Sequence, residues 1–237
     1  MLAGADRETT LDTLASAGFL DLCIGEEVGG GGLVLADLFP FALSLGARPW
    51  LAGALDTIIA RSVDPEARDV GDLEQFLVAA EQDEARAVAA VATAGLMVGA
   101  MQAMLAMTAE YAVVRKQFGR PVAQFQAVQQ QIAVMAEEVI AARMAAEWAF
   151  RALGTQALGG RTAVAKLRVN RAASVATAVA HAVHGAIGVS AEHSLSGFVH
   201  ALRNWRLSYG GSRRWAGTLG ETLLAEDIST IDFVRSL

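Results

Sequence analysis

Residues 107–136 read MTAEYAVVRKQFGRPVAQFQAVQQQIAVMA, and this stretch is the most informative in the chain for the fold. Its first part continues a long run of residues that favour helix. Gly119, Arg120 and Pro121 then predict a turn, because glycine commonly follows a helix and proline cannot continue one. From about Phe125 the helix-forming composition resumes and extends to Leu153. The stretch therefore predicts two long helices that are joined by a short turn.

The rest of the chain has the same character. Helix-favouring residues dominate it, alternating β-branched runs are nearly absent, and Pro121 is the only proline after Pro65. We therefore predict an all-α fold without a substantial sheet, and short loops between long helices predict antiparallel packing. The predicted helices cover, in chain order, residues 10–18, 36–44, 51–62, 73–114 (with a break allowed near 79–82), 125–153, 162–184, 194–207 and 213–225.

The chain divides into two segments at a linker that contains Pro65. We predict a short N-terminal helical segment over residues 1–72 and an antiparallel up-down helix bundle over residues 73–237. Four consecutive glycines, residues 29–32, predict a mobile or tightly turned loop within the first segment.

Composition narrows the class of protein. The chain has 237 residues, is 54% hydrophobic and 19% charged, and carries a formal net charge of −6. It can bury a large core, and the acidic balance argues against a nucleic-acid partner. The single cysteine, Cys23, excludes an intrachain disulfide and fits a reducing compartment. Residues 1–15 show no signal-peptide pattern, so we expect a cytoplasmic protein.

Residues 87–109 carry no charge and are long enough to span a bilayer. Their apolar character comes largely from alanine and glycine, which insert weakly into membranes. We therefore predict a helix that is buried in the middle of the bundle and no membrane span.

Histidines raise the question of a metal site. His181 and His184 lie one helical turn apart, and His193 and His200 follow. No carboxylate or cysteine completes a convincing ligand set with them. We predict no metal site and expect histidines that are satisfied within the fold.

Ten positions of the quoted stretch closely resemble a motif of the acyl-CoA dehydrogenase family. The motif is a tyrosine, Arg-x-Gln-Phe-Gly, a proline before a hydrophobic residue, and Phe-Gln-x-Val-Gln before an apolar helix. The matching residues are Tyr111, Arg115, Gln117, Phe118, Gly119, Pro121, Phe125, Gln126, Val128 and Gln129.

Two further stretches resemble the same family. His184–Gly188 with Glu192 and His193 is similar to the family's His-Gly-Gly-Ile-Gly…Glu-His segment. Residues 17–33 are similar to its N-terminal helix and glycine-rich loop, although Gly25 stands where proline is usual. The resemblance covers about residues 10–65 and 85–225.

The resemblance implies an FAD-dependent oxidoreductase of lipid metabolism that desaturates acyl-CoA thioesters. In the family a glutamate removes the α proton while the β hydrogen leaves as hydride to FAD, and the Arg-x-Gln-Phe segment reaches across a dimer to the neighbouring FAD. The implied cofactor-binding residues are Arg115, Gln117, Phe118, Phe125 and Gly185. A guanidinium suits a pyrophosphate. The other interpretation is that Arg115 is a cation that balances the dipole at the end of its helix.

The chain departs from the family in what it lacks. Only about residues 65–83 separate the two helical segments, which is too few for the family's β domain, the part that holds much of the flavin. The family's Tyr-Glu-Gly-Thr turn, one location of the base, reads Tyr209-Gly210-Gly211-Ser212 here, with Gly210 in place of the carboxylate. The second location of the base falls near Ala89 or Ala90, and the family's flavin-contacting glutamine aligns with Ala182.

Glu84, about one turn upstream of that second location, is the only catalytic candidate, and its other interpretation is a solvated residue in the acidic start of a helix. Asp83 and Arg86 share the spacing of the family's CoA-contacting Asp-x-x-Arg but lie about one turn early. A local basic cluster is either a solvated face or a phosphate contact, and it comprises Arg203, Arg206, Arg213 and Arg214.

Three interpretations remain. In the first, the chain is a non-catalytic subunit that completes the FAD site of a catalytic acyl-CoA dehydrogenase partner, as in the paired subunits of actinobacterial steroid side-chain degradation. In the second, it is a self-sufficient homodimeric acyl-CoA dehydrogenase that uses Glu84. In the third, it is a cofactor-free scaffolding bundle, which the alanine at position 182 favours.

Overall fold

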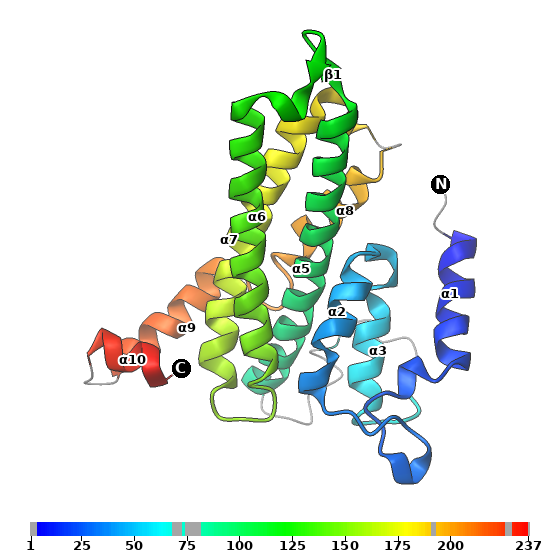
Figure 1. Ribbon diagram of the computed structural model, residues 1–237. Coiled ribbons are helices and arrows are strands. Elements are labelled where there is room, and N and C mark those ends of the chain that lie inside the picture. The colour runs from blue at the N-terminus through cyan, green and yellow to red at the C-terminus, as the bar shows by residue number, and fades with distance from the viewer. Residues whose placement is uncertain (1–3, 68–72, 74–81, 191–192, 226–228, 237) are drawn as a thin grey trace.

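The computed structural model describes residues 4–67, 73, 82–190, 193–225 and 229–236. Its centre is a bundle of long helices, with shorter helices at both ends of the chain packed around its lower half (Figure 1). The bundle consists of α5 (Gln82–Val114), α6 (Gln126–Phe150), α7 (Leu158–His184) and α8 (Leu195–Trp205), followed by α9 (Ser212–Ala225) and α10 (Thr230–Ser236).

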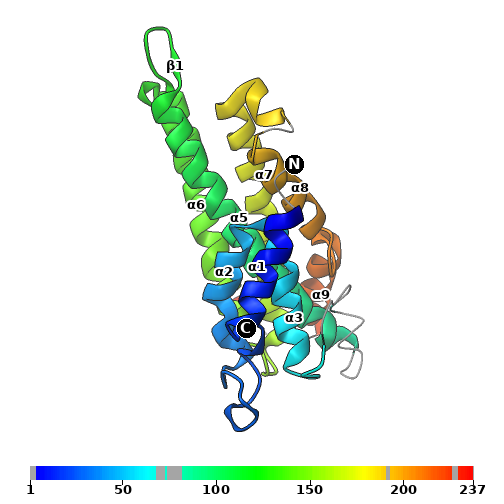
Figure 2. The same ribbon diagram turned by 90° about the vertical axis from the view of Figure 1, so that its right-hand side faces the viewer.

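The N-terminal segment lies beside the lower half of the bundle and on one side of it (Figures 1 and 2). It contains α1 (Gly4–Ser16), α2 (Phe39–Gly46) and α3 (Gly53–Arg61). Short 3₁₀ turns connect them at Phe19–Asp21, Glu26–Val28, Leu35–Leu38 and Pro49–Leu51. Buried side chains of α2 and α3 join those of the bundle in one continuous apolar core.

The predicted all-α class is confirmed, with local corrections. The expected helix over residues 36–44 is a 3₁₀ turn followed by α2, and α7 begins at Leu158, four residues before the expected start. The predicted turn at residues 119–121 belongs to a small hairpin of two strands, β1 (Lys116–Gln117) and β2 (Arg120–Pro121). α10 was not expected at all. The allowed break near residues 79–82 falls mostly outside the described residues, and α5 begins at Gln82.

α5 is the central helix of the bundle. It packs against α2, α3, α6, α7 and α8, and most of its alanine, valine and methionine side chains between residues 85 and 104 are buried. α5 and α7 are each long and apolar enough to cross a membrane, but 78% of the apolar window of α5 is buried inside the protein, against 39% for α7. The prediction that residues 87–109 form a buried bundle helix is therefore confirmed.

Glycines let α2 and α5 approach closely. A Cβ atom on Gly46 would overlap the backbone carbonyl of Leu96, and one on Gly99 would overlap that of Leu43. Because the clashing atoms are backbone atoms, a side chain at either position would force the two helices apart. Small residues at this crossing therefore fix the position of the N-terminal segment on the bundle.

We predict that Gly99→Ala lowers the free energy of unfolding by about 1–3 kcal/mol, because the added methyl group overpacks the crossing. Gly220→Ala is the matched control, since Gly220 lies inside α9 with no atom within 4 Å of a built Cβ. There the better helix propensity of alanine stabilises by up to about 1 kcal/mol. Urea titrations of both variants measure the difference, and equal effects would contradict the packing argument.

Candidate functional site

The β1–β2 hairpin projects beyond the end of the bundle (Figure 1). Gln117 pairs with Arg120, which leaves Phe118 and Gly119 as a two-residue turn with φ of 50° and 79°. This is the type I′ geometry, in which both central residues have positive φ. Glycine adopts it freely, whereas a left-handed phenylalanine costs roughly 1–2 kcal/mol. Despite this cost Phe118 is 91% exposed, so its ring is presented outward rather than buried in this chain.

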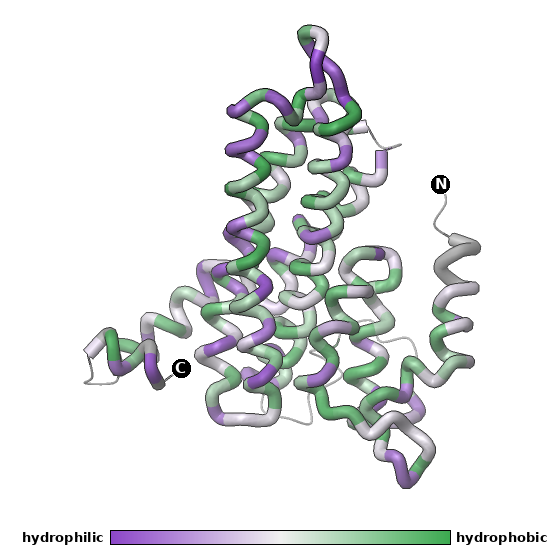
Figure 3. The backbone as a smooth tube through the Cα atoms, in the orientation of Figure 1, coloured by the Kyte–Doolittle hydropathy of each residue, from purple (hydrophilic) through white to green (hydrophobic). Residues whose placement is uncertain are grey.

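Cations surround this exposed ring. Arg115, Lys116 and Arg120 are all exposed, and the hairpin strands are hydrophilic (Figure 3). The Arg120 guanidinium lies 4.2 Å from the centre of the Phe125 ring, and Phe125 meets Phe118 edge-on at 6.1 Å. The Arg115 guanidinium makes no ion pair or hydrogen bond to the described residues of this chain. The hairpin therefore offers donors and an aromatic face to something outside the chain.

The C-terminal end of α7 lies at the same end of the bundle (Figures 1 and 2). The Tyr111 ring, in the last turn of α5, stacks on the His184 ring with centres 4.4 Å apart. Gly185 follows with φ of 63°, and no atom lies within 4 Å of a built Cβ there. The stack therefore brings Gly185 to the end of the molecule that carries Arg115, Gln117, Phe118 and Phe125.

The histidines of this end are only partly satisfied. His184 donates from Nδ1 to the Ala180 carbonyl at 2.8 Å, and its ring meets His193 edge-on at 5.1 Å. His184 Nε2 and His181 Nδ1 are buried and find no hydrogen-bond partner in the described part of the chain. The expectation of fully satisfied histidines is therefore wrong for these two atoms. Within the same residues, no three His, Cys, Asp or Glu side chains come together as a metal site.

We predict that acid weakens the fold through His184. Burial lowers the pKa of His184 below its usual 6.5; the Ala180 hydrogen bond opposes this, and the charges of His193 and His181 add to it. The unfolded chain therefore takes up this proton more readily, so the stability contribution is present above pH 6.5 and is lost as pH falls, by at most about 1.4 kcal/mol per pH unit. Urea titrations between pH 7 and 5 should show a shallower loss in His184→Phe than in the exposed-site control His200→Phe.

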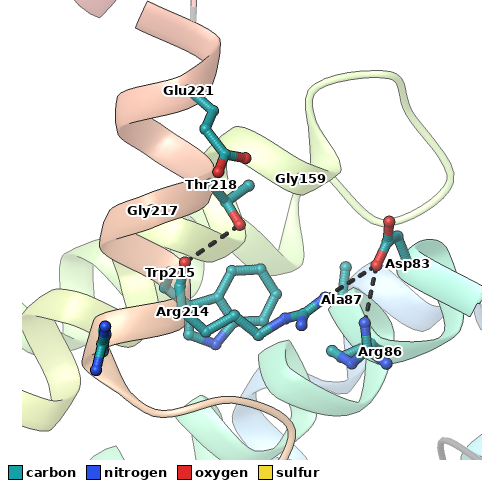
Figure 4. A pocket seen from close by; sticks show the side chains of 10 residues that line it. Asp83, Arg86, Ala87, Gly159, Arg214, Trp215, Gly217, Thr218 and Glu221 are labelled. Carbon is teal, nitrogen blue, oxygen red and sulfur yellow. Dashed lines mark hydrogen bonds and ion pairs between the residues drawn. The ribbon is translucent and has the colours of Figure 1, made fainter.

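A second feature lies at the opposite end of α5. A cavity of about 760 Å³ is bounded by the first turn of α5, the start of α7 and one face of α9. Asp83 accepts from Arg86 at 2.8 Å and from Arg214 at 3.1 Å, which joins α5 to α9 (Figure 4). The other charged side chains that line the cavity are Arg213 and Glu221. Three arginines against two carboxylates give the cavity a net positive lining.

The turn that carries Gly210 packs against Arg214 and Trp215, two residues that line this cavity. Tyr209 and Gly210 have φ of 56° and 107°. A Cβ atom on Gly210 would lie 2.9 Å from both Arg214 Cδ and Trp215 Nε1, and the Trp215 indole donates to the Gly210 carbonyl at 3.0 Å. At the position where the sequence predicts a missing carboxylate, backbone geometry and two side chains therefore leave no room for a side chain.

The remaining candidates for a base lie elsewhere. Ala89 and Ala90 are fully buried in the core. Glu84 is exposed and lines a neighbouring cavity of about 440 Å³ with residues of the α6–α7 connection. That cavity shares Asp83, Ala87 and Gly159 with the arginine-lined one, whose lining does not include Glu84. Cys23 is no nucleophile either, because burial, with the nearby Asp37 charge, raises the pKa of its thiol to about 11.

We predict that Gly210→Ala destabilises the protein by roughly 1–3 kcal/mol, because it strains the backbone and displaces Arg214 and Trp215. Gly211→Ala is the control, since its built Cβ meets nothing nearer than 3.7 Å. Its effect should stay within about 0.5 kcal/mol, as at other permissive surface positions. Thermal and urea unfolding compare the two, and a tolerated Gly210→Ala would refute the closed geometry.

The predicted site residues fall into two groups at opposite ends of α5. The five predicted cofactor contacts gather at one end of the bundle, while Asp83, Arg86 and the 213–214 pair gather at the other. Sequence reasoning missed Lys166 and Asn170, which hold the Gly210 turn from α7. A lysine and an asparagine among buried alanines of a long helix were the available signal.

Comparisons with known proteins agree with this arrangement. Residues 83–220 match the family described as acyl-CoA dehydrogenase, C-terminal domain. The acyl-CoA dehydrogenase FadE27 of Mycobacterium tuberculosis is 30% identical over 224 residues, which cover 83% of this chain and 59% of that protein.

Two heteromeric structures share the fold. The ChsE4–ChsE5 complex of Mycobacterium tuberculosis matches with a TM-score of 0.59 and 26% identity, over 62% of this chain and 40% of the matched one. The Tcur3481–Tcur3483 steroid ACAD, as a G363A variant, matches with a TM-score of 0.58 and 28% identity, over 61% and 40%. This chain thus spans about three fifths or less of the length of these relatives.

Proposed function

This chain belongs to the acyl-CoA dehydrogenase family, and we propose that it is a non-catalytic subunit that completes the FAD site of a catalytic partner. The partner performs the α,β-desaturation of an acyl-CoA thioester. The observation that carries the proposal is Phe118, which is 91% exposed at a positive φ on a hairpin whose cations Arg115, Lys116 and Arg120 are also exposed. A strained and solvent-exposed aromatic ring is costly unless it contacts a ligand or a partner.

The residues at this end fit part of an FAD site. Arg115 is free to donate to a pyrophosphate, Gly185 leaves room for close approach of a ligand to the backbone, and Phe118 offers a flat apolar face. Gln117 is exposed beside them and can donate a hydrogen bond. When bound, FAD supplies the acceptor for the hydride that leaves the acyl chain. This chain's own residues would bind and orient it.

The same residues are too few to hold FAD alone. α3 ends at Arg61 and α5 begins at Gln82, and that short connection leaves no length for a sheet domain between them. Exposed Val113, Val114, Ile187 and Val189 extend the apolar surface around the hairpin end. An apolar rim around cationic donors suits a protein partner that brings the rest of a flavin site with it. This supports a hetero-oligomer.

The arginine-lined cavity fits the anionic part of a CoA thioester. Arg86 and Arg214 are held by Asp83, while Arg213 makes no ion pair with the described residues. One guanidinium group can donate two parallel hydrogen bonds to two oxygens of the same phosphate. With Gly210 in place of a carboxylate, we assign this cavity to binding and not to proton removal.

We extend the proposal to the acyl group of a steroid side chain. The support is that one of the matched solved structures is named as a steroid ACAD and that both matched complexes pair two different chains. The self-sufficient alternative is weaker, because Glu84 is solvent-exposed and does not line the cavity that carries the arginines. The scaffolding alternative keeps one supporting observation, the alanine at position 182.

We predict that this chain purified alone carries no flavin absorbance, and that co-expression with an acyl-CoA dehydrogenase encoded beside it gives a yellow complex. Arg115→Ala should raise the Kd of the complex for FAD about tenfold or more, the usual loss for a charge-assisted hydrogen bond. Arg151→Ala is the matched control, since Arg151 pairs with Glu147 at the far end of α6.

Each outcome separates the three interpretations. Stoichiometric flavin on the lone chain would favour the self-sufficient enzyme, and a Glu84→Gln variant without activity would then complete that case. No flavin in either sample would favour the scaffold. Flavin in the complex with equal Kd values for Arg115→Ala and Arg151→Ala would remove the hairpin from the site.

A further inference from the structure

The segment that joins α8 to α9 has an energetically unfavourable backbone conformation. Two consecutive residues, Tyr209 and Gly210, have positive φ, and only the second is a glycine. A non-glycine residue in this region costs of order 1–3 kcal/mol and persists only where its surroundings hold it. Residues 205–212 must therefore be held by contacts from other elements.

Lys166 of α7 supplies one such contact. Its side chain is fully buried, and its Nζ donates to the Trp205 carbonyl at 3.0 Å and to the Ser208 carbonyl at 3.1 Å. The end of a helix leaves carbonyls without intrahelical donors, and a cation there also opposes the helix dipole. Burial lowers the pKa of Lys166 to about 8, because desolvation disfavours the charged ammonium.

Asn170 supplies the second contact, one helical turn after Lys166. Its Nδ2 donates to the Arg206 carbonyl at 3.3 Å and to Ser212 Oγ at 3.2 Å. Two side chains of α7 thus satisfy three carbonyls, that of the last residue of α8 and two just after it, and reach the first residue of α9. Buried carbonyls that lose their donors cost about 1–3 kcal/mol each, so the two contacts are strong constraints.

The held segment leads directly into the wall of the arginine-lined cavity. Arg213, Arg214 and Trp215 follow Ser212 in the first turn of α9. Trp215 is almost fully buried, and Arg214 reaches across to Asp83 of α5 (Figure 4). A shift of residues 205–212 would move this wall relative to Arg86.

We propose that Lys166 and Asn170 are positioning residues that clamp the turn at residues 205–212 and so place Arg213 and Arg214 against Arg86 in the cavity. The clamp acts on the segment and touches no ligand. The inference rests on the proposed function only for the identity of the ligand, a CoA thioester.

Hydrogen–deuterium exchange of the full chain tests the clamp by itself. In Lys166→Met, which keeps the length of the side chain and removes its donors, amide protection over residues 205–215 should fall about tenfold or more while α6 stays within about twofold. Asn170→Leu and the milder Ser212→Ala should loosen the same residues. The matched control is Ser174→Ala, because the Ser174 hydroxyl bonds only to its own helix at the Asn170 carbonyl.

A rescue experiment shows whether the turn needs the ammonium group of Lys166 or only the volume of its side chain. In a Cys23→Ser background, Lys166→Cys is alkylated with bromoethylamine in urea and refolded, which restores an ammonium on a side chain of nearly the original length. Protection over residues 205–215 should return to within about twofold of the parent, since the two carbonyl acceptors are satisfied again. Failure of the rescued protein to regain local protection would overturn the clamp.

Calorimetry with free coenzyme A then tests whether the clamp affects ligand binding in the arginine-lined cavity. Lys166→Met should raise the Kd for coenzyme A about tenfold. Arg213→Ala should raise it by a similar factor by removing a lining arginine, and Ser174→Ala should leave it unchanged. If the parent chain binds no coenzyme A, the proposed ligand fails while the exchange data still judge the clamp. Exchange that is unchanged, or lowered uniformly across α6 and residues 205–215, overturns the clamp whatever the calorimetry shows.

Discussion

Burial of α5 is the constraint on which the rest of the structure depends. The helix is 33 residues long, which corresponds to ~50 Å at 1.5 Å per residue. Most of its length is lined by small or flexible apolar residues, and it contacts α2, α3, α6, α7 and α8. Alanine and glycine keep those contacts short, so their backbones lie close and the helix cannot shift without disturbing α2 or α7. Whatever is attached to its two ends is therefore fixed in space.

Both candidate sites are attached to those ends. Asp83 and Arg86 stand on the first turn of α5, and Tyr111 and the hairpin follow its last turns. The two sites differ in how complete they are within the chain. The cavity is lined by residues of α5, α7 and α9 of this chain, whereas the hairpin leaves Phe118 91% exposed with only the edge of Phe125 against it among the described residues. A protein that finishes one site and leaves the other open is one that a second molecule would complete.

The helices could be predicted from sequence because the cause of each is local: few prolines, helix-favouring residues and glycines at the ends. The family could be predicted because one helix–turn–helix carries ten motif positions. The hairpin could not, since two strands of two residues have no periodicity and Phe118 contradicts its usual backbone preference. The Asp83–Arg214 pair joins residues 131 apart in sequence, and the Lys166 and Asn170 contacts span 36 to 42 residues. Such pairings depend on how helices pack, which no local pattern encodes.

The glycine at position 210 shows what packing adds to a motif. By sequence alone it is predicted to replace the family's carboxylate, and a single substitution would reverse that change. In the fold, the backbone at that position is left-handed, Arg214 and Trp215 occupy the space of a side chain, and α7 holds the turn from behind. A glutamate there would have to displace an arginine that is paired with Asp83 and a tryptophan that donates to the turn itself. A carboxylate at position 210 would therefore need changes in α5, α7 and α9, which supports the proposed binding role of the cavity over a catalytic one.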